Sequence, residues 1–413
     1  MLRIKKHSIL PALVAIGLAI PMGVANKFSP STQVSSIFDP QVVYIPIISI
    51  QTLLIIFYCL HYFEIIKVTF LQLIMAFLLC CLTLICAFFS LHPTGFLSYS
   101  TIWLVTPFAV AIQYKLLEDA RVMSFASTLS SIAYIYCPFY IIDFFISANA
   151  FGYDDFSSYT LASNGHTFIS MLFVLFIQFD CISKRQKFKI EFFKFLSLMI
   201  YMVGGVVSQG RVALILMLIS TIFVNWNRMK RALPLAVFFM AAVIYFNEKT
   251  NRIYNAIVML DFEDPVAWSS MISRFNFWTV FVDIFYNHPI AGVGGLSANI
   301  VKYDYYFQYH EFVDPHNEII FIISGFGFLG VVFIGLSILL TYSFRFLQLQ
   351  KARILICDNN RDMALVTLFF IAGCSLTNAN SAKQNIELVM CFTILYAVAS
   401  FVKMSKVKDN CSK

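Results

Sequence analysis

Apolar runs dominate this sequence, and their lengths constrain the fold more than any other feature. A helix needs about 20 mostly apolar residues to cross the hydrocarbon core of a bilayer. Only 12% of the residues are charged, whereas a typical soluble domain carries about 25%. We therefore predict an all-α polytopic membrane protein, a single integral membrane domain over residues 1–413 with about 12 transmembrane helices. The predicted helices lie at 8–25, 43–63, 68–90, 97–114, 122–146, 165–182, 194–208, 211–226, 232–247, 317–343, 363–378 and 387–402.

The first apolar run follows a basic N-terminal segment and has two interpretations. The combination is typical of a secretory signal peptide, and Gly23-Val24-Ala25 would serve as its cleavage site. Because many further apolar runs follow, we favour an uncleaved first helix with a cytoplasmic N-terminus.

Positive charges then predict the orientation. With the N-terminus in the cytoplasm, every predicted cytoplasmic connection holds at least one Lys or Arg, as the positive-inside rule requires. The C-terminus is then cytoplasmic as well. The net charge of +7 is thereby explained by topology and by contact with the lipid bilayer, without a nucleic-acid partner. The cations left on the outer face are Lys27, Arg211, Lys249, Arg252, Arg274, Lys302 and Lys383.

The largest outer connection is residues 247–316, between the predicted ninth and tenth helices. Within it, Met271–Tyr286 is rich in Phe and Val but also contains Arg274 and Asp283. A further crossing there would break the alternation of charge. We therefore expect a helix that lies in the membrane interface, with Trp278 among the lipid headgroups. A simple surface anchor is the alternative.

Arg211 is the most unusual of the outer cations. It follows Ser208-Gln209-Gly210 between two apolar runs, and an arginine at membrane depth is costly. Its guanidinium would either extend to the outer headgroups or bind an anion such as a phosphate bidentately. Arg274 is expected on the same face, so that the two arginines would suit a diphosphate. Lys383, in a short outer turn, would add a third cation.

His316 lies where the long outer connection meets the next helix. Pro315 keeps the chain extended or turned just before that helix begins. A histidine there is able to accept a proton from a hydroxyl group near neutral pH. Asp314 or Glu318 would orient the ring, and Asn317 lies between. A structural or solvated role is the default for a single loop histidine, and the two arginines on the same face favour the catalytic one.

The remaining polar features have simpler explanations. The glycine-rich segment Asn287–Gly295 lacks the context of a nucleotide-binding loop, so we expect a chain reversal with close backbone packing. Asp154 and Asp155 are adjacent rather than spaced for a metal and are read as a solvated turn. The cysteines lie in apolar runs or near cytoplasmic ends, so no disulfide, metal site or cofactor is expected.

These features together resemble the O-antigen ligase and O-antigen polymerase superfamily of bacterial inner membranes, over roughly residues 195–345. No single motif is specific, but their order, spacing and shared face are. The matching motifs are Gln209-Gly210-Arg211, Ser273-Arg274, His288-Pro289-Ile290-Ala291-Gly292-Val293-Gly294 and Pro315-His316-Asn317-Glu318.

The resemblance implies a GT-C-like membrane glycosyltransferase that is inverting and metal-independent. Its donor would be a glycan on undecaprenyl diphosphate at the periplasmic leaflet. By analogy, Arg211 and Arg274 would hold the diphosphate and His316 would act as general base toward an acceptor hydroxyl. The same roles follow from the residues themselves, because cations offset charge on a leaving diphosphate.

The sequence is compatible with three functions. A ligase passes the glycan to lipid A–core, and a polymerase passes it to a second lipid-linked repeat. The Pro-His-Asn-Glu start of the tenth helix and the single dominant outer loop favour the ligase. A transporter is the non-enzymatic alternative, but the sequence lacks two-half symmetry and its unusual residues gather on one face.

Overall fold

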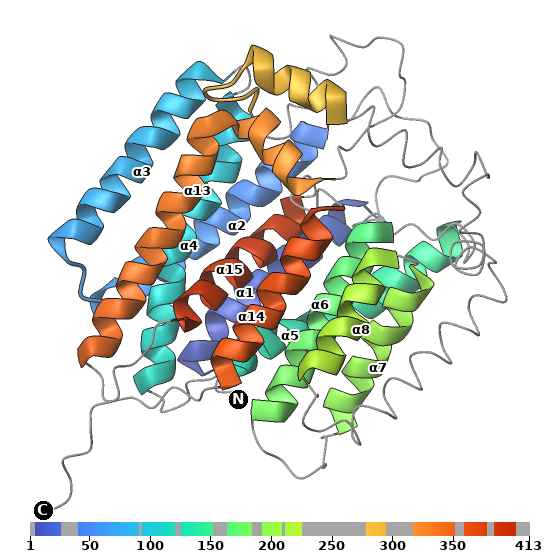
Figure 1. Ribbon diagram of the computed structural model, residues 1–413. Helices are drawn as coiled ribbons and strands as arrows, with labels where there is room; N and C mark the ends of the chain where they lie inside the picture. The colour runs from blue at the N-terminus through green and yellow to red at the C-terminus, as the bar shows by residue number, and fades with distance from the viewer. Residues whose placement is uncertain are drawn as a thin grey trace, which may run out of the picture.

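The computed structural model describes residues 5–25, 40–90, 93–119, 125–151, 163–183, 192–208, 211–224, 278–294, 317–351, 359–377 and 384–401. Within these ranges the chain forms helices and no strand (Figure 1). The long helices are α1 (Ile9–Ala25), α2 (Pro40–Tyr62), α3 (Phe70–Phe89), α4 (Pro93–Asp119), α5 (Phe125–Phe151), α6 (Ser163–Ser183), α7 (Phe192–Val207), α8 (Arg211–Val224), α13 (Glu318–Lys351), α14 (Asn359–Ser375) and α15 (Gln384–Ser400).

Each of these helices coincides with one of the predicted apolar runs, and the remaining prediction, 232–247, lies outside the described residues. The all-helical class is therefore confirmed for the part of the chain that the structure describes. By length and composition, 5 described helices could cross a membrane, namely α3, α4, α5, α6 and α13. The number of spans, about 12, stays a prediction.

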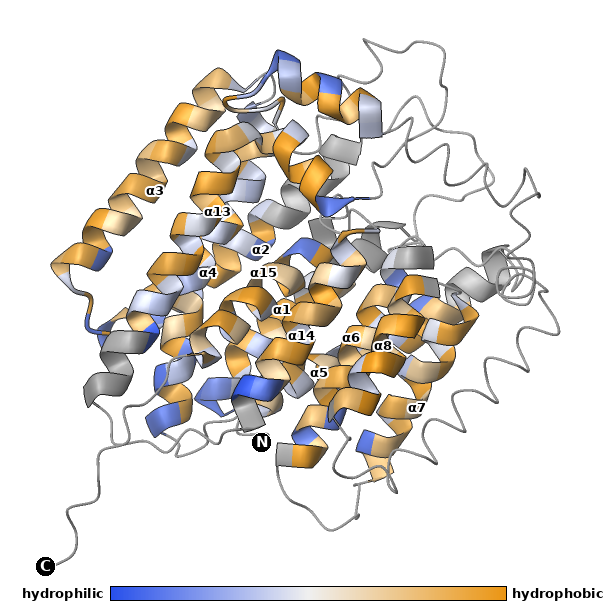
Figure 2. Cartoon of the chain, in the orientation of Figure 1, coloured by the Kyte–Doolittle hydropathy of each residue, from blue (hydrophilic) through white to orange (hydrophobic). Residues whose placement is uncertain are grey.

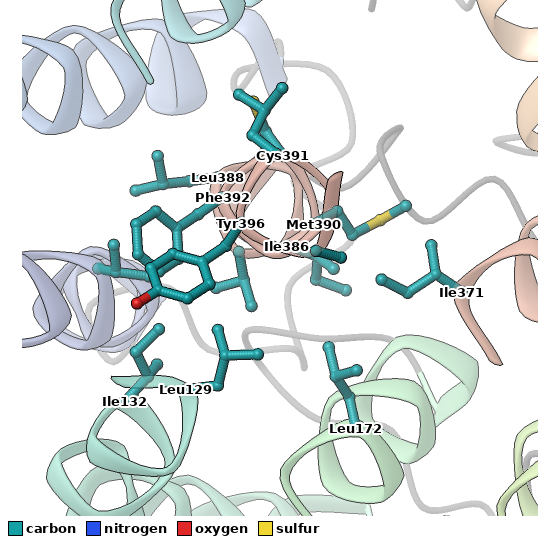
Figure 3. Packing of buried hydrophobic residues seen from close by; sticks show 14 of the residues in the cluster. Leu129, Ile132, Leu172, Ile371, Ile386, Leu388, Met390, Cys391, Phe392 and Tyr396 are labelled. Atoms are coloured by element: carbon teal, nitrogen blue, oxygen red, sulfur yellow. The ribbon is translucent and has the colours of Figure 1, made fainter. Parts of the chain in front are cut away.

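Helix α6 lies at the centre of the packing. It contacts α5, α7, α8 and α14, and side chains such as Phe168, Phe173 and Phe176 are fully buried. Helix α15 is similarly enclosed: Figure 3 shows it ringed by Leu129 and Ile132 of α5, Leu172 of α6 and Ile371 of α14. Burial of these side chains from both water and lipid defines the interior of the bundle.

Helix α3 lies at the edge of the bundle and is apolar on its outer side (Figures 1 and 2). Phe70 and Phe88 are 78% and 84% exposed, which suits contact with acyl chains rather than water. The helix begins with a capping box, in which Thr69 and Gln72 exchange side-chain and backbone hydrogen bonds. The Gln72 side chain also donates to Ser343 of α13 over 3.4 Å, which ties α3 to the bundle.

Hydrogen bonds bring the first and last described helices to one end of the bundle. Gln113 Nε2 donates to the His7 carbonyl over 2.6 Å, and the Tyr114 and Ser400 hydroxyl oxygens lie 2.6 Å apart. The Arg345 guanidinium lies 4.1 Å from the centre of the Tyr114 ring. We call this the lower end, as it is drawn in Figure 1, and the opposite one the upper end. Which end faces the cytoplasm stays a prediction.

Helix α13 differs from its prediction. The sequence predicts one uninterrupted helix at 317–343, whereas the observed helix runs from Glu318 to Lys351 and is broken at Gly327, with φ 60° and ψ −163°. Figure 1 shows the two arms of α13 meeting at an angle at the upper end. We call residues 318–326 the short arm. The break has a local cause, described below, in the segment that packs into it.

Candidate active site

A short helix at 278–287 lies across the upper end of the bundle, next to the bend of α13 (Figure 1). Its buried side chains Phe281 and Ile284 pack with Val293 and with Ile320 of the short arm. Tyr286, on the other side, is 73% exposed. The helix predicted at Met271–Tyr286 is thus confirmed for its second half, while 271–277 lies outside the described residues. Its place in a membrane interface stays a prediction.

The glycine-rich segment after this helix pairs with the bend of α13 through main-chain hydrogen bonds. The amides of Val293 and Gly294 donate to the carbonyls of Ser324 and Gly325 over 3.2 and 2.7 Å. In the other direction, the amides of Phe328 and Leu329 donate to the carbonyls of Pro289 and Ile290, both over 2.9 Å. These bonds satisfy backbone groups that the bend removes from the helix ladder and that would otherwise be left without partners.

Two glycines make this close pairing possible. Gly292 and Gly327 have φ values of +65° and +60°, a region that other residues avoid. A Cβ at Gly292 would lie 2.5 Å from the Gly325 carbonyl carbon, and one at Gly327 would lie 2.6 Å from that of Ile290. The predicted chain reversal with close backbone packing is therefore confirmed as far as residue 294, and its partner is the bend of α13.

Asn317 fixes the start of the short arm. Its side-chain oxygen accepts from the amides of Ile319 and Ile320 over 3.0 and 3.2 Å, as an N-cap residue does. Its side-chain nitrogen donates to the Leu376 carbonyl over 3.3 Å. One side chain thus joins the start of α13 to the end of α14. His316 directly precedes this residue in the chain.

The end of α14 in turn lies beside the start of α8. Gly373 allows the contact, because a Cβ there would lie 2.6 Å from a methyl carbon of Leu216. Along the two helix axes, Arg211 is about 7.5 Å from Leu216, and Leu376 is about 4.5 Å from Gly373, at 1.5 Å per residue. Both steps lead toward the upper end, where α8 starts and α14 ends. The backbones at Arg211 and Asn317 therefore flank the end of α14.

The structure describes only part of the predicted site. Arg211 is the first residue of α8, and its side chain is not among those described. Asn317 and Glu318 are described and buried, with Glu318 the first residue of the short arm. Arg274, Asp314, His316 and Lys383 lie outside the described residues. The structure thus brings the first residue of α8, Arg211, to the same end of the bundle as Asn317, which follows His316 in the sequence. The position of His316 and the contacts of the Arg211 side chain stay predictions.

Glu318 lies beside two groups that the sequence analysis did not single out. It interacts electrostatically with Glu387, in the first turn of α15, and with the hydroxyl of Tyr99. Both carboxylate oxygens of Glu387 are buried and make no hydrogen bond within the described residues. An acidic residue inside an apolar helix, as at Glu387, is a signal that sequence alone offers.

His166 is the second residue that the sequence analysis missed. It lies in the first turn of α6, fully buried, and its Nδ1 lies 3.2 Å from the Ser208 hydroxyl oxygen at the end of α7. Only Gln209 and Gly210 separate Ser208 from Arg211 in the sequence. This histidine lies in the apolar run predicted at 165–182, and the sequence analysis assigned it no role.

The fold is that of a helical membrane protein in which α8, α13 and α15 begin at one end of the bundle, with Asn317, Glu318 and Glu387 buried there. Residues 167–335, less than half of the chain, match the family described as O-antigen ligase, and the resemblance to that superfamily is confirmed. The matched region runs from the first turn of α6 past the bend of α13. No curated protein matches the chain. The family comprises ligases and related polymerases that act on lipid-linked glycans.

Proposed function

We propose that this protein is an O-antigen ligase of the bacterial inner membrane. It transfers O-polysaccharide from undecaprenyl diphosphate to lipid A–core at the periplasmic face. The observation that carries this proposal is the convergence of the starts of α8 and α13 on the end of α14, through Leu216–Gly373 and Asn317–Leu376. Two motifs that are distant in the sequence, those that contain Arg211 and Asn317, therefore reach one end of the bundle.

The proposed chemistry needs cations and a base on that face. Arg211 and Arg274, with Lys383, bind the donor diphosphate and offset the charge that develops as it leaves. His316 accepts the proton of the acceptor hydroxyl, whose oxygen attacks the anomeric carbon from the side opposite the diphosphate. That attack inverts the configuration of the anomeric carbon. With arginines supplying the positive charge, the reaction needs no metal ion.

The neighbours of His316 support its proposed role. Asn317 and the pairing of the short arm with Gly292–Gly294 hold the chain on one side of the histidine. Asp314 and Glu318 flank it in the sequence and are proposed to orient its ring. Glu318 is 5% exposed and lies within electrostatic reach of Tyr99 of α4 and Glu387 of α15, so its carboxylate is not a solvated surface group.

A polymerase is the competing function, because the family includes both enzymes. The two differ in the acceptor: a ligase uses lipid A–core, a polymerase a second lipid-linked repeat. A lipopolysaccharide gel of a strain that lacks this protein separates them. A ligase leaves free core together with intact lipid-linked polymer, and a polymerase leaves core that bears a single repeat. An unchanged ladder contradicts both functions.

A further inference from the structure

A buried hydrogen-bond network ties the end of α7 to α5 and α6, immediately before the chain reaches Arg211. The Ser208 hydroxyl donates to the Gly204 carbonyl over 2.6 Å. It also lies 3.2 Å from His166 Nδ1 and accepts from the Thr167 hydroxyl over 3.1 Å. Tyr140 stacks on the His166 ring with 4.5 Å between the ring centres. All of these side chains are at least nine-tenths buried.

The donors and acceptors of the network specify the state of the histidine. Ser170 donates to the His166 carbonyl over 2.6 Å, and the Tyr140 and Ser170 hydroxyl oxygens lie 2.6 Å apart. Because the Ser208 proton is directed to Gly204, the Ser208 oxygen is left as an acceptor for Nδ1–H. Because Ser170 donates to the His166 carbonyl, Tyr140 donates to Ser170, and the Tyr140 oxygen, 3.3 Å from Nδ1, is a second acceptor. The network therefore assigns the proton of His166 to Nδ1.

Close helix packing holds the network in place. A Cβ at Gly204 would overlap the Tyr140 hydroxyl, and one at Gly205 would overlap the Met171 side chain. Helix α7 therefore approaches α5 and α6 as closely as its backbone allows. The last residue held in this way, Ser208, precedes the two-residue link to the first residue of α8.

We propose that His166 is a positioning residue for the diphosphate-binding site. Through Ser208 it fixes the end of α7, and thereby the start of α8, at which Arg211 is attached. This inference rests on the proposed function of Arg211 as a ligand of the donor diphosphate. It assigns His166 a role in the geometry of donor binding rather than in proton transfer.

The test compares donor binding and turnover in full-length variants, with undecaprenyl diphosphate as the binding probe. We expect His166→Ala and Ser208→Ala to weaken binding roughly tenfold, as when a charged hydrogen bond is weakened, and to raise the donor KM more than they lower kcat. Asparagine places an amide N–H near the position of Nδ1 and glutamine places one near Nε2. His166→Asn should therefore restore binding, and His166→Gln should not.

Two controls separate the possible failures. Tyr201→Phe removes another buried hydrogen bond of α7, to the Ala133 carbonyl over 2.5 Å, about two turns before Ser208. This variant should leave the donor KM unchanged. In an Arg211→Ala background, His166→Ala should weaken binding no further. Three results would overturn the inference. The first is wild-type donor affinity in His166→Ala, and the second is equal donor affinity of His166→Asn and His166→Gln. The third is a double variant whose loss of binding free energy equals the sum of the two single losses. Wild-type binding in Arg211→Ala alone overturns the proposed function instead. If His166→Ala does not reach the membrane, the comparison of Asn with Gln decides.

Discussion

The Asn317 side-chain nitrogen donates to the Leu376 carbonyl over 3.3 Å, while its oxygen caps the short arm of α13. One residue therefore performs two tasks at the point where the segment bearing His316 enters the bundle. A mutation can separate the two tasks, because aspartate keeps the capping oxygen and lacks the donor nitrogen. The link to α14 and the helix cap can thus be tested independently.

Asn317→Ala should lower the free energy of unfolding by about 1 kcal/mol through loss of the cap. Asn317→Asp should keep the contribution of the cap, because the capping oxygen remains. Glycan transfer should fall in both variants, since both lose the bond to Leu376. Thermal unfolding of the purified protein and transfer activity are the two measurements. Full activity in Asn317→Asp would show that the link to α14 does not contribute to the site.

Gly292→Ala and Gly327→Ala should destabilise the bend of α13. Each places a Cβ within 2.6 Å of a backbone carbon, at a positive φ that by itself costs about 1–2 kcal/mol. Gly335→Ala is the matched control, because a Cβ there meets nothing within 4 Å and alanine favours a helix by about 0.5–1 kcal/mol. Thermal unfolding should rank Gly335→Ala above the wild type and the other two below it. Equal stability of all three variants would contradict the pairing at the bend.

Glu387→Gln should raise the midpoint of thermal unfolding. Its buried carboxylate oxygens make no hydrogen bond within the described residues and lie within electrostatic reach of Glu318. Glutamine keeps the shape but cannot ionise, so it removes the cost of burying, beside Glu318, an ionisable group that has no hydrogen-bond partner in the described part of the chain. Glu387→Ala is the matched comparison, because it also removes the charge but leaves a cavity. A lower midpoint of unfolding for Glu387→Gln would mean that the Glu387 carboxylate binds a cation or a hydrogen-bond donor beyond the described residues.

Lys194 and Asp180 should be strongly coupled in their contributions to the free energy of unfolding. Nζ lies 3.6 Å from Oδ2, and the two side chains are 11% and 1% exposed. Removing one charge, as in Asp180→Asn or Lys194→Met, should cost about 3–5 kcal/mol because the other remains buried. The double variant should recover much of that loss. Additive losses in a double-mutant cycle of unfolding free energies would exclude direct coupling of the two groups.

The sequence predicted the helices well because the membrane demands long apolar runs, and those runs need no knowledge of their partners. It also predicted that Asn287–Gly295 would reverse the chain by close backbone packing. It did not predict the break at Gly327, because the cause is pairing with residues more than 30 positions earlier. A glycine within an apolar run is compatible with an unbroken membrane helix, so the pattern itself gave no warning.

The residues of the candidate site also divide into those that the sequence indicates and those that only tertiary packing reveals. Arg211 and His316 stand out in sequence because each is a polar group at the edge of an apolar run. His166 and Glu387 also lie at the start of such runs, 165–182 and 387–402, but they are single polar residues without a motif around them, and their importance depends on neighbours from other helices. Ser208 is informative only once its contacts with His166 and Thr167 are seen. Local pattern therefore indicated the outer positions of the site, while tertiary packing supplied what holds them.

The central claim is that Arg211 and His316 act together in glycan transfer from a lipid diphosphate. The most direct test is transfer by the purified full-length protein, from an undecaprenyl-diphosphate-linked glycan to lipid A–core, without added metal. We predict product with the wild type, none with His316→Ala, and a large loss with Arg211→Lys, since an ammonium lacks the bidentate geometry of a guanidinium. Transfer by His316→Ala at the wild-type rate would contradict the account.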